Sequence, residues 1–263
     1  MGEALLGGLV DAGWEPEAMA VAEVDPDRRR VLETRFPGVR VVPSAAWAVG
    51  EADLVVVAVK PGDVVTVLEG AAGTLPDGAL VLSIAAGVRL ATLESALPDR
   101  AVVRAMPNTA ALVGCGVAAI AGGRLAADTD LDLAERALRA VGAVVRVPEP
   151  LLDAVTGLSG SGPAYVFLVA EALIEAGVLV GLPRDIATTL VVETIRGAAA
   201  LLAEGGESPE ALRAAVTSPG GTTAAGLAAL EAHGTRAAFL DAVRRATERS
   251  RELGRPDPQS SGQ

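Results

Sequence analysis

The first 150 residues alternate short Val-rich runs with amphipathic segments, and this alternation limits the possible folds more than any other feature. We expect strands at Met19–Glu23, Val39–Val42, Leu54–Val59, Leu80–Ile84, Ala101–Met106 and Ala143–Val147, with helices at Asp27–Phe36, Asp63–Ala72 and Leu131–Val141. The unbroken apolar run Leu54–Val59 is typical of a parallel sheet covered on both faces. The alternation therefore predicts an α/β domain over residues 1–150.

After about Pro150 the pattern becomes entirely helical. We expect helices at Pro163–Val180, Pro183–Ala203, Pro209–Val216, Thr222–Ala232 and Thr235–Leu253. Proline suits the first turn of a helix, and Ser161 and Ser208 stand at cap positions before two of these segments. Residues 151–254 are therefore predicted to form a helical domain. The polar, Pro-containing residues 255–263 are expected to be a disordered tail.

The composition limits the possible binding partners of the protein and the cellular compartment in which it is expected. A net charge of −11 argues against nucleic acid and against an anionic membrane surface. The single cysteine, Cys115, excludes an intrachain disulfide framework and fits a reducing cytoplasm. Glu171 and Glu175 interrupt the long apolar stretch Ala164–Val180, and the N-terminus has no export signal pattern. We therefore expect a cytoplasmic protein with no membrane or nucleic-acid partner.

The N-terminus matches half of a dinucleotide-binding fingerprint. Such folds open with a strand, then G-x-G-x-x-G, then a helix, with an acidic residue about 20 residues further on that binds the ribose. Here Gly2 could be the last glycine, and Glu23 is the acid at the end of the next predicted strand. Taken alone, one glycine and one acid are weak signals, and an ordinary α/β protein would be the favoured interpretation.

Polar residues follow several predicted strands. Lys60, the only lysine in the chain, stands at the end of the strongest strand, where ligands bind in open α/β sheets. It could equally be a solvated lysine. Arg104–Thr109 ends another strand with an amide and a hydroxyl, and Leu158–Pro163 joins the two predicted domains.

The segment Val216–Thr223, with the sequence VTSPGGTT, is a candidate anion site. Its two glycines allow a ligand to approach the backbone amides, and Thr222 and Thr223 stand at the start of a predicted helix. A small carboxylate would fit there. The alternative is an ordinary turn in which Thr222 caps the next helix.

Five segments together resemble the pyrroline-5-carboxylate reductase family in the family's order. They are Ala58–Pro61, Ser83–Val88, Arg104–Thr109, Ser159–Tyr165 and Val216–Thr223. The resemblance implies an NADPH- or NADH-dependent oxidoreductase that reduces 1-pyrroline-5-carboxylate to L-proline, the last step of proline biosynthesis. It also implies an N-terminal Rossmann-type parallel sheet, an all-helical domain that interlocks with a second subunit, and a homodimer or ring of dimers.

The resemblance indicates which residues form the substrate and cofactor sites. We expect substrate binding by Ser161, Ser218, Gly220, Gly221, Thr222 and Thr223, and cofactor binding by Gly2, Glu23, Asp25, Ala58, Val59, Lys60, Pro61 and Asn108. Thr223 is the expected catalytic residue, because its hydroxyl would bond the imine or amine nitrogen. No metal is expected. His233 and Cys115 lack the partners of a catalytic base or nucleophile.

The chain also departs from the family. Members carry a strand and a Gly-rich turn before the position of Met1, so this sheet is expected to lack its first strand, and upstream in-frame DNA should encode both. Glu23-Val24-Asp25 replaces residues that bind a ribose phosphate, and carboxylates there favour a 2′-hydroxyl, although Arg28, Arg29 and Arg30 could offset this. Ala110 replaces a common proline with little expected effect.

Two alternatives remain open at the level of sequence. A β-hydroxyacid-dehydrogenase-like enzyme has a similar domain order, but it usually uses a lysine in its helical domain, and no lysine follows Lys60. The second alternative is a non-catalytic oligomerising remnant with an incomplete cofactor loop.

Overall fold

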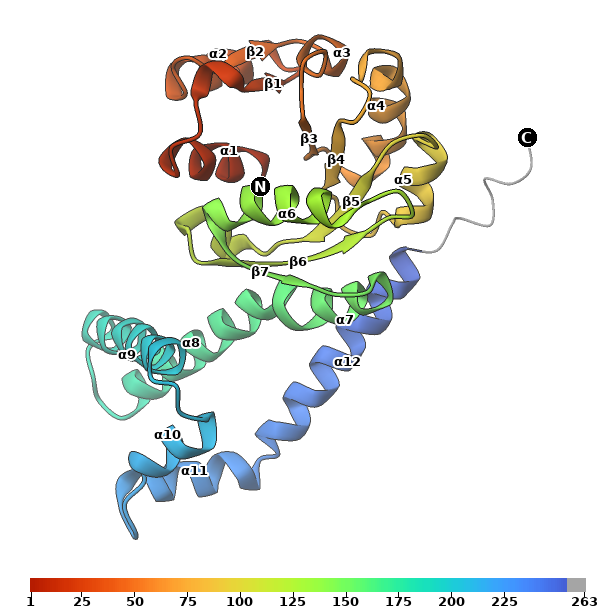
Figure 1. The fold of residues 1–263 in the computed structure, drawn as a ribbon. Coiled ribbons are helices and arrows are strands. Elements are labelled where there is room, and N and C mark those ends of the chain that lie inside the picture. Colours follow the sequence, from red (N-terminus) through yellow and green to blue (C-terminus); the bar gives the residue numbers. More distant parts are fainter. Residues whose placement is uncertain (255–263) are drawn as a thin grey trace. The chain divides into compact units, whose positions relative to one another are not determined.

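The computed structural model describes residues 1–254, which divide into two compact units (Figure 1). Of the described residues, unit 1 contains 1–161 together with 245–254, and unit 2 contains Gly162–Arg244. Unit 1 therefore includes the end of the last helix. The functional division into residues 1–150 and 151–254 stays a prediction, and the expected tail at 255–263 lies outside the described residues.

The strands of the described chain all lie in unit 1, together with short helices. The strands are β1 (Ala20–Ala22), β2 (Arg40–Val42), β3 (Leu54–Val57), β4 (Leu80–Ser83), β5 (Val102–Met106), β6 (Gly116–Gly122) and β7 (Gly142–Arg146). The α-helices are α1 (Gly2–Asp11), α2 (Pro26–Arg35), α3 (Ala45–Ala48), α4 (Val64–Ala71), α5 (Leu90–Ala96), α6 (Asp128–Leu138) and α7 (Leu152–Val155).

These strands form two sheets. Strands β1 and β2 pair in parallel, and the other five follow the order β3-β4-β5-β6-β7, parallel except between β5 and β6. Among the described residues, no strand pairs with β1 or β3 on its other edge. Val57, Ser83 and Arg104 lie side by side, so β3, β4 and β5 end at the same edge.

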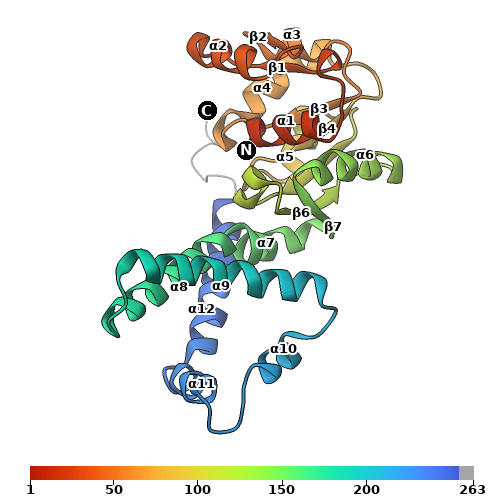
Figure 2. The same ribbon diagram turned by 90° about the vertical axis from the view of Figure 1, so that its left-hand side faces the viewer.

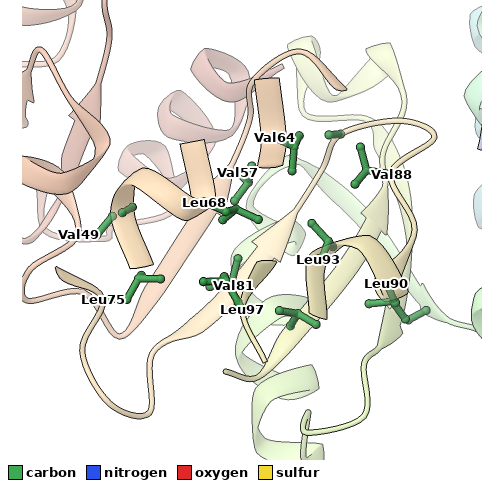
Figure 3. Packing of buried hydrophobic residues seen from close by; sticks show 14 of the residues in the cluster. Val49, Val57, Val64, Leu68, Leu75, Val81, Val88, Leu90, Leu93 and Leu97 are labelled. Atoms are coloured by element: carbon green, nitrogen blue, oxygen red, sulfur yellow. The ribbon is translucent and has the colours of Figure 1, made fainter. Parts of the chain in front are cut away.

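Apolar side chains cover both faces of the five-stranded sheet. One core joins α4, α5 and α7 to the sheet through residues that include Val64, Leu68, Leu93 and Leu152. Figure 3 shows Val64, Leu68 and Leu93 among the packed side chains of this core. The other core joins α1 and α6 to the opposite face. Strand β4 is buried along its whole length, as expected for a strand between two helical layers.

Helix α1 packs on both sheets. Leu5 and Leu9 belong to the core beneath the five-stranded sheet. Leu6, on another side of the same helix, packs with Leu32 and Phe36 beside the β1–β2 pair. One amphipathic helix thus joins the two sheets without any strand pairing between them.

The predicted strands agree with those of unit 1, with one omission, whereas the short helices α3, α5 and α7 were not predicted. The Rossmann-like α/β class is confirmed, and the predicted strands all occur, several of them shorter at their ends. The pattern missed β6, whose sequence GVAAIAG consists mostly of small residues with low strand propensity. Because β6 runs antiparallel to β5, the sheet is mixed and not purely parallel as expected.

Unit 2 is helical within Gly162–Arg244. It contains α8 (Gly162–Leu179), α9 (Arg184–Glu204), α10 (Pro209–Ala215), α11 (Thr222–Ala232) and the first part of α12 (Thr235–Leu253). Helices α8 and α9 pack against each other, and Arg184 donates to both carboxylate oxygens of Glu175 at 2.9 and 3.2 Å. Hydrogen bonding to this guanidinium lowers the pKa of Glu175. The helices predicted for Pro163–Leu253 are all present as α8 to α12, and their ends differ from the predicted ends by about one residue at most.

The surface of α8 and α9 is unusually apolar. Their exposed side chains include Phe167 (63%), Leu168 (65%), Leu179 (87%), Leu190 (51%) and Leu201 (60%). By length and composition alone, Glu149–Leu179 and Arg184–Glu204 are apolar enough to cross a membrane. So large an apolar surface indicates a partner or a membrane, and the expected absence of a membrane partner stays a prediction.

A partly buried ion pair joins β5 to the segment before α7. The Arg104 side chain is 5% exposed, and its Nη1 donates to Glu149 Oε1 at 3.0 Å. The same oxygen accepts the backbone N–H of Leu90 at the start of α5, at 2.7 Å. Glu149 therefore neutralises the buried charge of Arg104 and accepts a hydrogen bond from the Leu90 amide, which would otherwise be unpaired at the start of α5.

We expect Glu149→Ala to lower the free energy of unfolding of unit 1 by about 3 kcal/mol, because Arg104 would keep a buried charge without its partner. Urea titration followed by tryptophan fluorescence measures this unit, since Trp14 and Trp47 both lie in it. Glu252→Ala is the control. It removes an exposed ion pair with Arg249 and should cost less than about 1 kcal/mol. Equal effects of the two substitutions would contradict this role of Glu149.

Candidate active site

The N-terminus of α1 lies against the loop that follows β3. A Cβ added to Gly2 would be 2.9 Å from the Cβ of Ala58, so glycine allows this close approach. No side chain caps the first turn of α1. An uncapped helix start presents free N–H groups and a positive dipole end, which suits the phosphates of a dinucleotide.

Glu3, the next residue of α1, connects this helix start to α2. Its two carboxylate oxygens accept from Arg28 and from Arg35, the latter at 2.5 Å. Arg28 stands in the first turn of α2, just after the loop that follows β1. The loops after β1 and β3 are therefore both held close to the first turn of α1.

The two acidic residues after β1 make local contacts. Asp25 caps α2, since Oδ1 accepts from the backbone N–H groups of Asp27 at 2.8 Å and Arg28 at 3.2 Å. Glu23 accepts the N–H of Asp25 through Oε1 at 3.0 Å. The Asp25 carboxylate therefore caps α2. The second oxygen of Glu23, Oε2, remains available to a ligand.

Lys60 and its neighbours lie in the loop at the carboxyl end of β3. Ala58, Val59, Lys60 and Pro61 are all exposed, and Pro61 begins a short 3₁₀ turn. The ends of β4 and β5 share this edge of the sheet. The arrangement therefore places the only lysine where ligands bind in open α/β sheets.

Asn108, just after β5, joins two segments of unit 1. Its Nδ2 donates to the carbonyl of Ser159 at 3.1 Å, and its Oδ1 accepts from the N–H of Val117 at 3.2 Å. Ser159 lies in a π-helical turn, Thr156–Gly160, which ends at Ser161. Asn108 thus orients the segment that contains Ser159 and Ser161, and π-turns often occur at functional sites.

The Val216–Thr223 segment forms a tight turn before α11. The N–H of Gly221 donates to the carbonyl of Ser218 at 3.0 Å, and Gly220 has φ of +69°, as position three of a type II turn requires. A Cβ on Gly221 would lie 2.4 Å from Ser218 Oγ. Pro219, Gly220 and Gly221 are therefore each suited to this turn.

The hydroxyls of this turn are available to a ligand. Ser218, Thr222 and Thr223 are exposed, and within residues 1–254 their side chains make no hydrogen bond. Thr222 does not cap α11, whose N-cap position is Gly221 without a side-chain bond. In contrast, Thr217 donates its hydroxyl to the carbonyl of Arg213 at 2.6 Å. Three free hydroxyls therefore adjoin the uncapped start of an eleven-residue helix.

The predicted site residues fall into two groups. Gly2, Ala58 and Asp25 converge in unit 1, where Asn108 also supports the segment with Ser161. Ser218, Gly220, Gly221, Thr222 and Thr223 form the turn in unit 2. The sequence analysis missed Glu3, Arg35 and the π-turn. The only local signal for Glu3 was its place directly after the candidate glycine.

Two family models cover most of the chain. A model described as pyrroline-5-carboxylate reductase dimerisation matches residues 149–253. A second model, described as NADP oxidoreductase coenzyme F420-dependent, matches residues 1–87.

Curated relatives and solved structures match nearly the whole chain. A pyrroline-5-carboxylate reductase from Synechocystis is 46% identical, covering 97% of this chain and 95% of the relative, and one from Escherichia coli is 39% identical with the same coverage. The structure of a pyrroline-5-carboxylate reductase from Coxiella burnetii matches with a TM-score of 0.93 at 35% identity, covering 97% of this chain and 95% of that one. A Plasmodium falciparum pyrroline carboxylate reductase with NADP bound matches with a TM-score of 0.84 at 30% identity and the same coverage.

Proposed function

The chain belongs to the pyrroline-5-carboxylate reductase family, and we propose how its residues reduce 1-pyrroline-5-carboxylate to L-proline with NAD(P)H. This reaction completes proline biosynthesis. The relatives and structures carry the reductase name, and none of these comparisons favours a β-hydroxyacid dehydrogenase. The observation that carries the proposal is the turn before α11, with its free hydroxyls and uncapped helix start.

The reaction adds two hydrogens to a cyclic C=N bond. When bound, NAD(P)H supplies the hydride for the imine carbon, and the nitrogen takes up a proton. The protein must hold the carboxylate, present one face of the ring and orient the nitrogen. Hydride transfer from the cofactor to an imine requires no protein nucleophile and no metal.

The substrate carboxylate is the natural ligand of the turn. The first N–H groups of α11 and the hydroxyls of Ser218 and Thr222 would bond its oxygens, helped by the helix dipole. Gly220 and Gly221 leave the backbone accessible because neither carries a side chain. Ser161, which ends the π-turn, is proposed as a further substrate contact.

Thr223 is proposed to bond the reacting nitrogen. It is the second residue of α11, and its hydroxyl is exposed and unused within the described chain. A hydroxyl can accept from a protonated imine and can also donate to an amine. Thr223 would therefore hold the nitrogen in place while the carbon–nitrogen bond is reduced.

The cofactor is proposed to bind in unit 1. The free amides at the start of α1 would hold its phosphates, with Gly2 allowing close approach. Lys60 and Asn108, with Ala58, Val59 and Pro61, would line the nicotinamide side. Glu23 and Asp25 would lie at the ribose end.

We expect Thr223→Ala to lower kcat/KM for the imine by about ten- to a hundredfold, because a hydrogen bond to a charged group is worth about 1.5–3 kcal/mol. Cofactor affinity should stay unchanged, since the proposed cofactor residues lie in the other unit. Steady-state oxidation of NAD(P)H, with proline quantified, gives the first quantity, and fluorescence titration of the cofactor gives the second.

Thr217→Ala is the matched control. Its hydroxyl already bonds the carbonyl of Arg213, so its loss should cost much less activity. Wild-type rates in both variants, or an equal fall in cofactor affinity and catalysis in Thr223→Ala, would show that the substrate binds elsewhere.

The apolar surface of α8 and α9 is proposed to be the subunit interface. The dimerisation model spans both helices, and burial between two subunits explains why their leucines and Phe167 are exposed within one chain. A homodimer is the proposed unit, with a ring of dimers as the larger assembly. A cytoplasmic location also stays a prediction.

We expect Phe167→Asp combined with Leu190→Asp to lower the mass measured by light scattering toward that of a single chain, because two charges would be buried in the interface. Trp47→Asp is the control, since Trp47 is 66% exposed but lies in unit 1, and its mass should match wild type. An unchanged mass in the double variant would place the interface elsewhere.

A further inference from the structure

The ribose end of the proposed cofactor site is electrostatically unusual. Resting on the proposed function, we infer that this chain selects NADH over NADPH, with Glu23 as the residue that accepts from the ribose hydroxyl. We further infer that Glu3 supports this choice by holding Arg28 and Arg35 away from a 2′-phosphate. The two cofactors differ only in that phosphate, so the groups that surround the end of β1 decide between them.

Glu23 presents a free carboxylate oxygen at this position. It follows β1 directly and lies 21 positions after Gly2, the spacing at which an acid bonds the ribose in dinucleotide folds. Its Oε1 accepts the N–H of Asp25 at 3.0 Å, which fixes the side chain beside the backbone of the loop. Oε2 is left to accept a ribose hydroxyl and would repel a phosphate.

The other side chains of the loop, Val24 and Asp25, carry no positive charge. Val24 is apolar and 82% exposed, at the tip between the two acids. Asp25 is fixed as the cap of α2 by its contacts with Asp27 and Arg28. Among the side chains of the loop itself, a 2′-phosphate would therefore meet two carboxylates and a valine.

The arginines of α2 could offset this, but each is already paired. Arg28 and Arg35 both bond Glu3, whose side chain is only 24% exposed. Arg29 donates to the carbonyls of Glu23 and Val24, both at 2.8 Å. Arg30 pairs with Asp27 at 2.9 Å. These contacts fix each guanidinium at its present partner, and the Glu3 and Asp27 carboxylates reduce the positive charge that Arg28, Arg35 and Arg30 would offer a phosphate.

Glu3 is the most informative of these partners because it lies outside the loop. It belongs to α1, and its removal leaves the caps and backbone contacts of the loop unchanged. Glu3→Ala would release the guanidinium groups of Arg28 and Arg35 from their ion pairs. This substitution should therefore improve binding of a 2′-phosphate without altering the carboxylate of Glu23.

The test is calorimetric titration of the full chain with ADP-ribose and with its 2′-phosphate. Both fragments carry the same pyrophosphate, so the ratio of their Kd values reports the 2′-group alone. Wild type should bind ADP-ribose at least about tenfold more tightly. Glu3→Ala and, independently, Glu23→Ser should each shift the ratio toward the phosphate by about tenfold.

Glu33→Gln is the matched control, since it removes an exposed carboxylate from α2 and should leave the ratio within about twofold. Circular dichroism confirms that each variant is folded. Tighter binding of the 2′-phosphate by wild type, or an unchanged ratio in both variants, would overturn the inference while leaving imine reduction intact. If neither fragment bound to wild type, the proposed cofactor site would fail as well.

Discussion

The packing of α1 against both sheets is the contact on which the arrangement of unit 1 depends. Leu5 and Leu9 face the five-stranded sheet, and Leu6 faces the β1–β2 pair, although no described strand of one sheet pairs with the other. The same helix presents its uncapped start beside Ala58 and binds α2 through Glu3. In Figure 2, α1 lies between α2 and the strands of the larger sheet. Hydrophobic burial along one helix therefore also sets where the proposed phosphate, ribose and nicotinamide contacts lie.

Much of this architecture could be predicted because local patterns specify it. The continuous apolar run that begins at Leu54 gave a strand, and the periodicity of Thr235–Leu253 gave a helix with the observed bounds. The dipeptide Pro219-Gly220, followed by Gly221, predicted a tight turn, which the positive φ of Gly220 confirms. The family and its reaction, inferred from five short segments, are confirmed by relatives over nearly the whole chain. The roles of individual site residues stay predictions.

Other features depend on contacts that are distant in sequence. Strand β6 is rich in alanine and glycine, and it is a strand because β5 and β7 pair with it on both sides. Glu3 pairs with residues 25 and 32 positions away, so no local pattern could show that two of the arginines are already occupied. Asp25 was expected to meet the ribose, yet its Oδ1 caps α2. The sequence shows which residues are charged, whereas the fold determines which of these side chains remain available to a ligand.

Transfer of deuterium from the cofactor to proline tests the central claim most directly. The enzyme is supplied with 1-pyrroline-5-carboxylate and with NADH or NADPH deuterated on one or the other face of nicotinamide C4, and the product is analysed by mass spectrometry and NMR. The account predicts L-proline with a single deuterium at C5, the former imine carbon, from one face only. Unlabelled proline, or no proline with either cofactor, would contradict it.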